Sequence, residues 1–119
     1  MLAMLIPILA LALQVHPPQT GTDLYEDCQS AVRYADSGGE NLSNDEVAKG
    51  LTCMAFIDGY HDGLWEGNET ICIPSDVSVE TLVRGYLRFM QKNPTLMNPP
   101  KNIGLNFALR DAYSCPVKR

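Results

Sequence analysis

Histidine is scarce in this sequence: it occurs twice, and only His61 lies beyond the first twenty residues. A hydrolytic triad needs a histidine base beside an activated nucleophile. The nearest charged neighbours of His61 on a helical face are Asp58 and Asp62, and no serine carries a nucleophile motif. Such a trio could hold a divalent metal, but it is more typical of a solvated helix end. We therefore expect no enzymatic activity, no metal and no cofactor.

Closely spaced cysteine pairs are also missing. A structural zinc site would use Cys-x-x-Cys pairs or a nearby His-x-x-x-His, and neither pattern occurs. The chain instead has four widely separated cysteines: Cys28, Cys53, Cys72 and Cys115. An even number of cysteines behind a secretory-looking start is typical of a disulfide framework in an oxidising compartment.

No charged residue precedes Asp23. The apolar run from Leu2 to Leu13 is shorter than the roughly 20 residues of a membrane-spanning helix, but it suits the hydrophobic region of a signal peptide. Ala10-Leu11-Ala12 provides a small-x-small cleavage site. These features predict export to the periplasm.

The chain has no repeats, low-complexity runs or interior linkers, which indicates one mature domain. Residues 16–21 contain two prolines and no helix cap, which disfavours the alternative of a buried N-terminal core helix. We expect residues 1–20 to be a signal peptide with a flexible lead-in, and residues 21–119 to form the domain. Its core is small, so covalent cross-links would stabilise it.

The net charge of −5 belongs entirely to the expected mature domain, because the leader carries no charge. A negative surface makes nucleic acid and anionic membranes poor partners. A basic protein would be a better one.

Four stretches place apolar residues at helical spacing, which predicts an all-α, compact four-helix domain. The first begins at Thr22 or Asp23 and ends at Ser37-Gly38-Gly39, and the second runs from a capping box at Ser43–Glu46 to about Trp65. The third begins after Ser78 and ends at Asn93-Pro94. The fourth has Pro99 in its first turn and ends at Tyr113-Ser114.

The second predicted helix carries two apolar stripes. One contains Val47, Leu51, Met54 and Ala55, and the other contains Cys53, Ile57, Tyr60 and Leu64. A helix that is apolar on most sides is expected in the middle of a bundle. Gly50 in this helix predicts a close approach by a neighbouring backbone, while Gly59 and Gly63 predict either close approach or a break.

Helix topology favours one of the three cysteine pairings. If the first two helices form a hairpin around residues 38–43, Cys28 and Cys53 lie at similar distances from the turn. Cys72 precedes the third helix and Cys115 follows the fourth, so a second hairpin would bring these two together. We therefore predict two helical hairpins, stapled by Cys28–Cys53 and Cys72–Cys115. The loop-entropy model assigns these closures about 3.5 and 4 kcal/mol.

Several segments resemble the Rap/Tai family of immunity proteins. The resemblance rests on Phe56-Ile57-Asp58-Gly59-Tyr60 after Cys53, Ile71-Cys72-Ile73-Pro74, Val77–Val83, Asn93-Pro94 and Ala112-Tyr113-Ser114-Cys115. It extends from about Leu24 to Cys115. It implies a small periplasmic helical protein that binds peptidoglycan amidase effectors of type VI secretion, often as a homodimer, and blocks the amidase cleft with a loop or helix end.

Two segments are candidate contact surfaces for such an effector. In residues 91–100, Leu96, Met97 and Asn98 could reach a partner, although Leu96 and Met97 could equally fold back to close the end of the bundle. In residues 60–68, His61 and Trp65 are candidates, but core burial is the more typical role of a lone tryptophan.

Two other functions fit parts of the sequence. An acid-stress chaperone of the small periplasmic helical kind would use the fourteen acidic residues, although two disulfides would oppose its loosening. A small-ligand carrier would need a cavity that so short a core can hardly provide.

Overall fold

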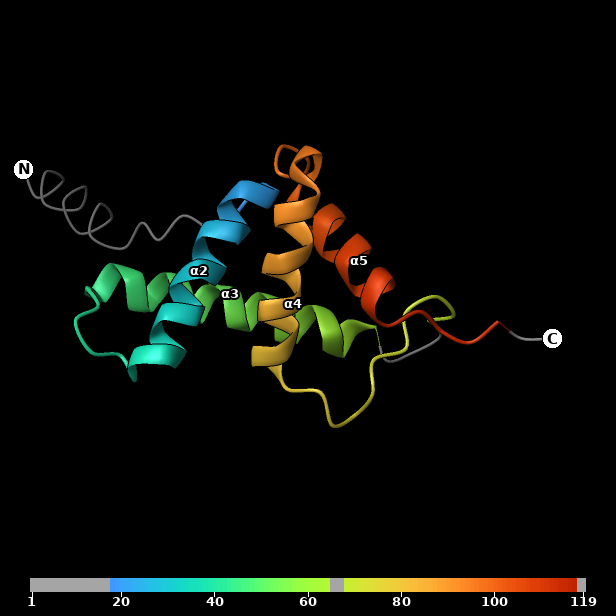
Figure 1. Ribbon diagram of the computed structural model, residues 1–119, viewed down its shortest axis with the longest axis horizontal. Coiled ribbons are helices and arrows are strands. Elements are labelled where there is room, and N and C mark those ends of the chain that lie inside the picture. Colours follow the sequence, from blue (N-terminus) through green and yellow to red (C-terminus); the bar gives the residue numbers. More distant parts are fainter. Residues whose placement is uncertain (1–17, 65–67, 118–119) are drawn as a thin grey trace, which may run out of the picture.

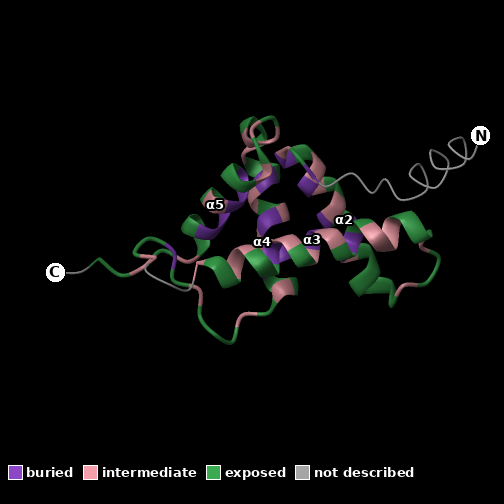
Figure 2. Cartoon of the chain, turned by 180° about the vertical axis from the view of Figure 1, so that it is seen from behind, coloured by how far each residue is buried: buried purple, intermediate pink, exposed green. Residues whose placement is uncertain are grey.

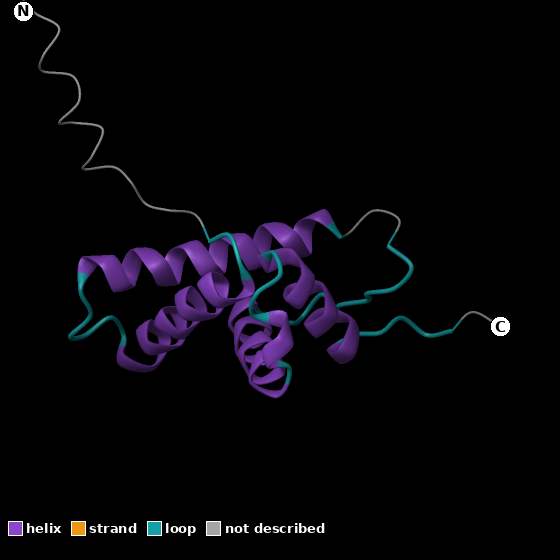
Figure 3. Ribbon diagram, turned by 90° about the horizontal axis from the view of Figure 1, so that it is seen from above, coloured by secondary structure: helices purple, strands orange, loops and turns teal. Residues whose placement is uncertain are grey.

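The computed structural model describes residues 18–64 and 68–117, and this part of the chain is helical between its connections. The helices are α2 (Gly21–Ser37), α3 (Asn44–Gly63), α4 (Val79–Lys92) and α5 (Lys101–Ala112), with a short 3-10 helix, η1 (Pro94–Leu96), before α5. α4 packs between α2 and α5, and α3 crosses behind them (Figure 1). Seen from above, α3 runs along one side of the domain (Figure 3). The predicted all-α, four-helix domain is confirmed.

α4 lies in the middle of the domain. It contacts the other three helices and buries the residues of its predicted apolar stripe, Leu82, Val83, Tyr86 and Met90. The Tyr86 hydroxyl donates a hydrogen bond of 3.2 Å to the carbonyl oxygen of Gly21 at the start of α2. This bond connects the centre of the core to the first turn of α2.

The prediction that the second helix occupies the middle of the bundle is wrong. α3 buries Gly50, Cys53 and Ile57 but leaves Leu51 56% exposed. From behind, α3 lies in front of the other helices and presents mainly exposed and half-buried residues (Figure 2). α3 can remain outside because α4 already fills the space between α2 and α5.

Gly50 allows α2 and α3 to approach each other closely, as predicted. A Cβ atom at this position would lie 3.1 Å from the Cα and the amide nitrogen of Ala31 on α2. Gly59 does not break α3, which continues to Gly63. The predicted end at Trp65 falls outside the described residues.

The helix starts are fixed by polar side chains, although not always the predicted ones. Ser43 and Ser78 cap α3 and α4 as predicted, each accepting a hydrogen bond from a backbone amide three residues later. The complete capping box lies instead on α2, between Thr20 and Asp23. Pro99 is not in the first turn of α5, because that helix begins at Lys101.

The last residues of the expected lead-in contact the domain. Pro18 is buried, and the carbonyl oxygen of Gln19 accepts a hydrogen bond of 3.1 Å from the amide of Lys101 on α5. Thr20 forms an isolated bridge with Pro100. The start of α2 is therefore held against the start of α5.

Both predicted disulfides are confirmed. Cys28 pairs with Cys53, with Cα atoms 5.1 Å apart, and Cys72 pairs with Cys115, with Cα atoms 4.8 Å apart. Cys28 and Cys53 are fully buried between α2 and α3. Cys72 is exposed, so the two bonds lie in different environments. Among the described residues, no helix is both long enough and apolar enough to span a membrane.

Replacing Asp23 by asparagine should lower the stability of the domain in a pH-dependent way. The Asp23 carboxylate accepts hydrogen bonds from the amides of Gln19 (3.0 Å) and Thr20 (3.1 Å). These bonds favour the charged form and lower the Asp23 pKa from its ordinary value. The stabilisation is therefore present above the unfolded-state pKa of about 3.9 and is lost as the pH falls through the lower folded-state pKa.

Urea unfolding at a series of pH values measures this effect. At pH 7, Asp23→Asn should lose about 0.5 kcal/mol of unfolding free energy, the order expected for an exposed charge at a helix start. The difference from the unchanged protein should disappear at acidic pH. Glu26→Gln, in the same helix, is the control. A deficit that persists unchanged in acid would contradict this account of Asp23.

Candidate partner-binding surfaces

The loop between α4 and α5 is held against the start of α2. The carbonyl oxygen of Met97 accepts hydrogen bonds from the backbone amide (2.9 Å) and the hydroxyl (3.1 Å) of Thr22, and that of Pro99 accepts one from the amide of Gly21 (3.0 Å). Leu96 and Met97 are half-buried against the core, whereas Asn98 is exposed. This geometry favours a loop that closes the end of the bundle, with Asn98 at its surface.

Leu96→Asp separates the two roles proposed for this loop. Because Leu96 packs against the core, we expect the variant to lose about 2 kcal/mol, which corresponds to a fall of roughly 10 °C in the melting temperature of a domain this small. Thermal unfolding followed by circular dichroism measures the shift. Asn98→Asp in the same loop should leave the melting temperature unchanged. An unchanged melting temperature for Leu96→Asp, with loss of effector binding, would identify Leu96 as an anchor instead.

His61 lies at the other end of the molecule, near the end of α3. It is half-buried and lines an open cavity of about 370 Å³. The other lining residues are Leu64, Asn68, Ile71, Cys72, Ile73 and Pro74. Leu96, Met97 and Asn98 follow the C-terminal end of α4, whereas the cavity beside His61 is lined by residues that precede α4 (Figure 1). The structure therefore does not bring His61 together with these three residues. Trp65, the remaining predicted contact residue, falls outside the described residues.

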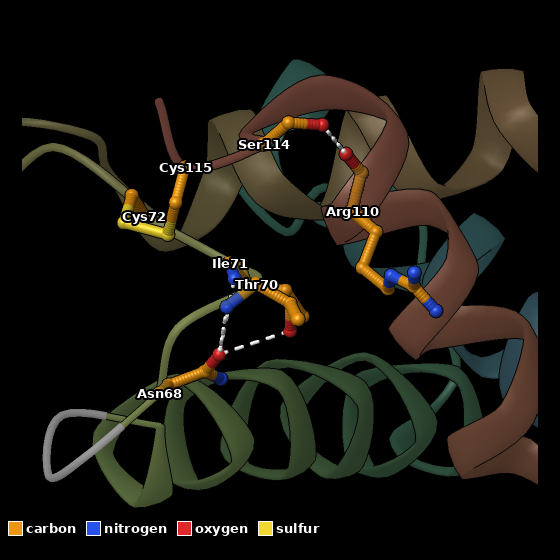
Figure 4. The surroundings of a disulfide bond; sticks show 7 residues. All are labelled: Asn68, Thr70, Ile71, Cys72, Arg110, Ser114 and Cys115. Atoms are coloured by element: carbon orange, nitrogen blue, oxygen red, sulfur yellow. Dashed lines mark hydrogen bonds between the residues drawn. A yellow bond between two sulfur atoms is a disulfide. The ribbon is translucent and has the colours of Figure 1, made fainter. Parts of the chain in front are cut away.

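The Cys72–Cys115 disulfide cross-links the wall of this cavity. The amide of Cys72 donates to the carbonyl oxygen of Tyr113 (2.7 Å), and the amide of Cys115 donates to that of Thr70 (3.2 Å). The side-chain oxygen of Asn68 accepts hydrogen bonds from the amides of Thr70 and Ile71 (Figure 4). These contacts fix the segment before α4 against the segment after α5.

A second open cavity, of about 630 Å³, adjoins the first at the same disulfide. Asn68 and Cys72 line both cavities, and the second is completed by Glu69, Thr70, Arg110, Ser114, Cys115, Pro116 and Val117. Arg110 projects from α5 near the disulfide and lines this second cavity (Figure 4). The disulfide end thus presents two concave surfaces with mixed polar and apolar walls.

Negative charge gathers on α2 and α3. Between residues 20 and 64 the chain has nine acidic and two basic side chains. Both basic groups face carboxylates: Arg33 Nε lies 3.4 Å from Glu46, and Lys49 Nζ lies 3.1 Å from Asp45. Burial raises the pKa of Asp27, although the charge of Lys49 opposes this shift. The α2–α3 hairpin therefore carries most of the negative charge of the domain.

No group of histidine, cysteine, aspartate and glutamate side chains in residues 18–64 and 68–117 is arranged to hold a metal ion. Asp58, His61 and Asp62, the trio singled out in the sequence, do not form such a group. All four cysteine sulfurs are in disulfides.

Beyond His61, Leu64 and Asn68, which lie in the predicted contact segment 60–68, the sequence does not point to the residues that line the cavities. In the second cavity, Arg110 and Ser114 lie far along the chain from Thr70, and the Cys72–Cys115 disulfide joins the two segments. The one local signal is the apolar character of Ile71-Cys72-Ile73-Pro74 in a short connection. Apolar residues around a cysteine in a loop fit the wall of a recess as well as a core.

The profile of the Rap1a immunity protein family matches residues 20–115 of this helical, doubly cross-linked chain. The chain belongs to the Rap1a immunity protein family. The match covers all four helices and all four cysteines, and it confirms the resemblance found in the sequence. No curated protein and no solved structure matches the chain significantly. Membership of the Rap1a family indicates a role in immunity against an effector, exerted by binding a protein partner.

Proposed function

We propose that this protein binds a peptidoglycan amidase effector of type VI secretion in the periplasm and inhibits it. The observation that carries the proposal is the family match over residues 20–115. The amidase as target is supported by the resemblance of the segments around Cys53, Cys72 and Cys115 to Rap/Tai proteins. The binding surface that we propose includes His61 and the cavity beside it.

Two features support action outside the cytosol. Disulfides persist in oxidising compartments and are rare in the bacterial cytosol, and this chain holds two. The first fifteen residues have the composition of a signal peptide. A domain cross-linked in this way keeps its binding surface preorganised, which lowers the entropic cost of association.

Co-expression tests the proposal. Candidate type VI amidases are directed to the periplasm of a host bacterium, with and without the full-length protein, and lysis is followed by optical density. We expect lysis by the cognate amidase alone and growth when both proteins are exported. A catalytically inactive amidase is the control for toxicity that is unrelated to peptidoglycan.

Two results would contradict different parts of the proposal. Failure to protect against every amidase tested would contradict the inhibitory function. Protection by a form that lacks residues 1–17, and is retained in the cytoplasm, would contradict the proposed site of action.

A further inference from the structure

One apolar stripe of α3 is only partly covered by the rest of the described structure, because Met54 packs against the core while Leu51 and Ala55 are exposed. The stripe, which we call the outer stripe, consists of Val47, Leu51, Met54 and Ala55. Leu51 is 56% exposed, Ala55 is exposed, and Val47 and Met54 are half-buried. A single exposed leucine is ordinary on a protein surface. An exposed leucine flanked by three apolar residues at helical spacing is a patch, and contiguous patches of this kind often mark interaction sites.

The core-facing side of α3 does not include Leu51 and Ala55. A neighbouring face of α3 supplies Cys53 and Ile57, both fully buried, and close contact with α2 occurs at Gly50. A helix with one core-facing side normally carries polar residues on its other side. In α3, leucine and alanine lie where polar residues would be expected.

The outer stripe leads along α3 toward the His61 cavity. Val47, Leu51, Met54, Asp58 and His61 follow one another at steps of four, three, four and three residues, which keeps them on one side of the helix. At about 1.5 Å per residue, this line is roughly 21 Å long. The stripe and the cavity are therefore continuous on one surface.

Charge indicates what this surface can bind. Asp58 and Asp62 are exposed beside the stripe, and Lys49 is already paired with Asp45. A second copy docked here would bring two hairpins together, each with nine acidic and two basic side chains. Like charges facing each other across an interface oppose association. A basic protein surface with an apolar recess would complement the stripe in both respects.

We propose that the outer stripe, together with the His61 cavity, is the surface that docks the effector. This inference rests on the proposed function. The effector would present an apolar recess for Leu51, bordered by lysine or arginine side chains that face Asp58 and Asp62.

Binding measurements with purified protein test the assignment. The exported full-length protein is titrated against a panel of catalytically inactivated type VI amidases by calorimetry. Leu51→Arg should weaken binding to the cognate amidase about 30-fold or more, because it replaces a central apolar contact with a charge of the same sign as the partner. Phe107→Arg, at a 46% exposed aromatic on the outer face of α5, is the matched control and should bind normally.

Two further variants separate binding from folding and test the charge argument. Ala55→Arg, also in the stripe, should weaken binding while its circular dichroism melting curve stays normal, which guards against misfolding of the Leu51 variant. Asp58→Lys with Asp62→Lys should lower the association rate about tenfold at low salt and flatten its salt dependence. Asp111→Lys on α5 is the control for these charge changes.

The outcomes distinguish this inference from the function on which it rests. If the unchanged protein binds an amidase and both stripe variants bind it equally well, the stripe assignment is wrong and the function stands. If Leu51→Arg turns a dimer into a monomer in size-exclusion chromatography without changing amidase affinity, a second copy occupies the stripe and the inference is overturned. If the unchanged protein binds no amidase, the proposed function fails and the stripe assignment fails with it.

Discussion

Tyr86→Ala should lower the free energy of unfolding by about 4 kcal/mol, the usual cost of deleting a fully buried aromatic ring. Tyr86 is 1% exposed and lies on α4, which contacts the three other helices. Removing the ring would leave a cavity at the centre of the domain and would also remove the hydrogen bond to Gly21. Chemical unfolding followed by circular dichroism measures the loss. Because small domains have only about 5 to 15 kcal/mol of stability, the variant should unfold at much lower denaturant concentration.

Tyr86→Phe is the matched control, because it keeps the ring and removes only the hydroxyl. It should lose about 1 kcal/mol, the net contribution of one hydrogen bond. Burial raises the pKa of Tyr86 above its ordinary value. The stabilisation that comes from burying the neutral Tyr86 side chain should therefore be present below the unfolded-state pKa of about 10. It should be lost as the pH rises above that value. If the alanine and phenylalanine variants lost the same free energy of unfolding, the hydrogen bond and not ring packing would account for most of the effect of Tyr86.

Replacing Cys28 and Cys53 together by alanine should cost about 4 to 5 kcal/mol. The loop-entropy model gives roughly 3.5 kcal/mol for a closure over 25 residues. A packing term adds to this value because both sulfur atoms are fully buried between α2 and α3. Urea unfolding of the double variant under non-reducing conditions measures the total.

The second disulfide provides the comparison. Replacing Cys72 and Cys115 by alanine removes a closure over 43 residues, for which the same model gives about 4 kcal/mol. Cys72 is exposed, so a mild reductant applied to the native protein should open this bond first, and alkylation followed by mass spectrometry identifies which cysteines react. Faster reduction of Cys28–Cys53 would show that burial does not protect it.

The features that depend on local sequence could be predicted. Ser43 and Ser78 cap their helices because a serine hydroxyl reaches the amide three residues later whatever the rest of the fold does. The disulfide pairing could also be predicted, because Cys28 and Cys53 lie at similar distances from the turn that joins their helices. A glycine inside an apolar helix predicts a close approach at Gly50, and the structure places Ala31 there.

The features that depend on long-range packing could not be predicted. The two stripes of α3 are similarly apolar, and only the positions of α2 and α4 decide that Cys53 and Ile57 become buried while Leu51 does not. The second cavity needs the segment around Cys72 to pair with residues 113–115, more than forty positions away. Pro100, the residue before α5, forms an isolated bridge with Thr20, eighty positions earlier, and no local pattern indicates that contact.

The cysteine connectivity also bears on how the native bonds arise. Each cysteine pairs with its immediate neighbour along the chain, first with second and third with fourth. A chain whose thiols are oxidised in the order in which they emerge from the N-terminal side reaches this pattern directly. It needs no later exchange between wrongly joined partners, so a simple oxidant without an isomerase should suffice to mature the domain.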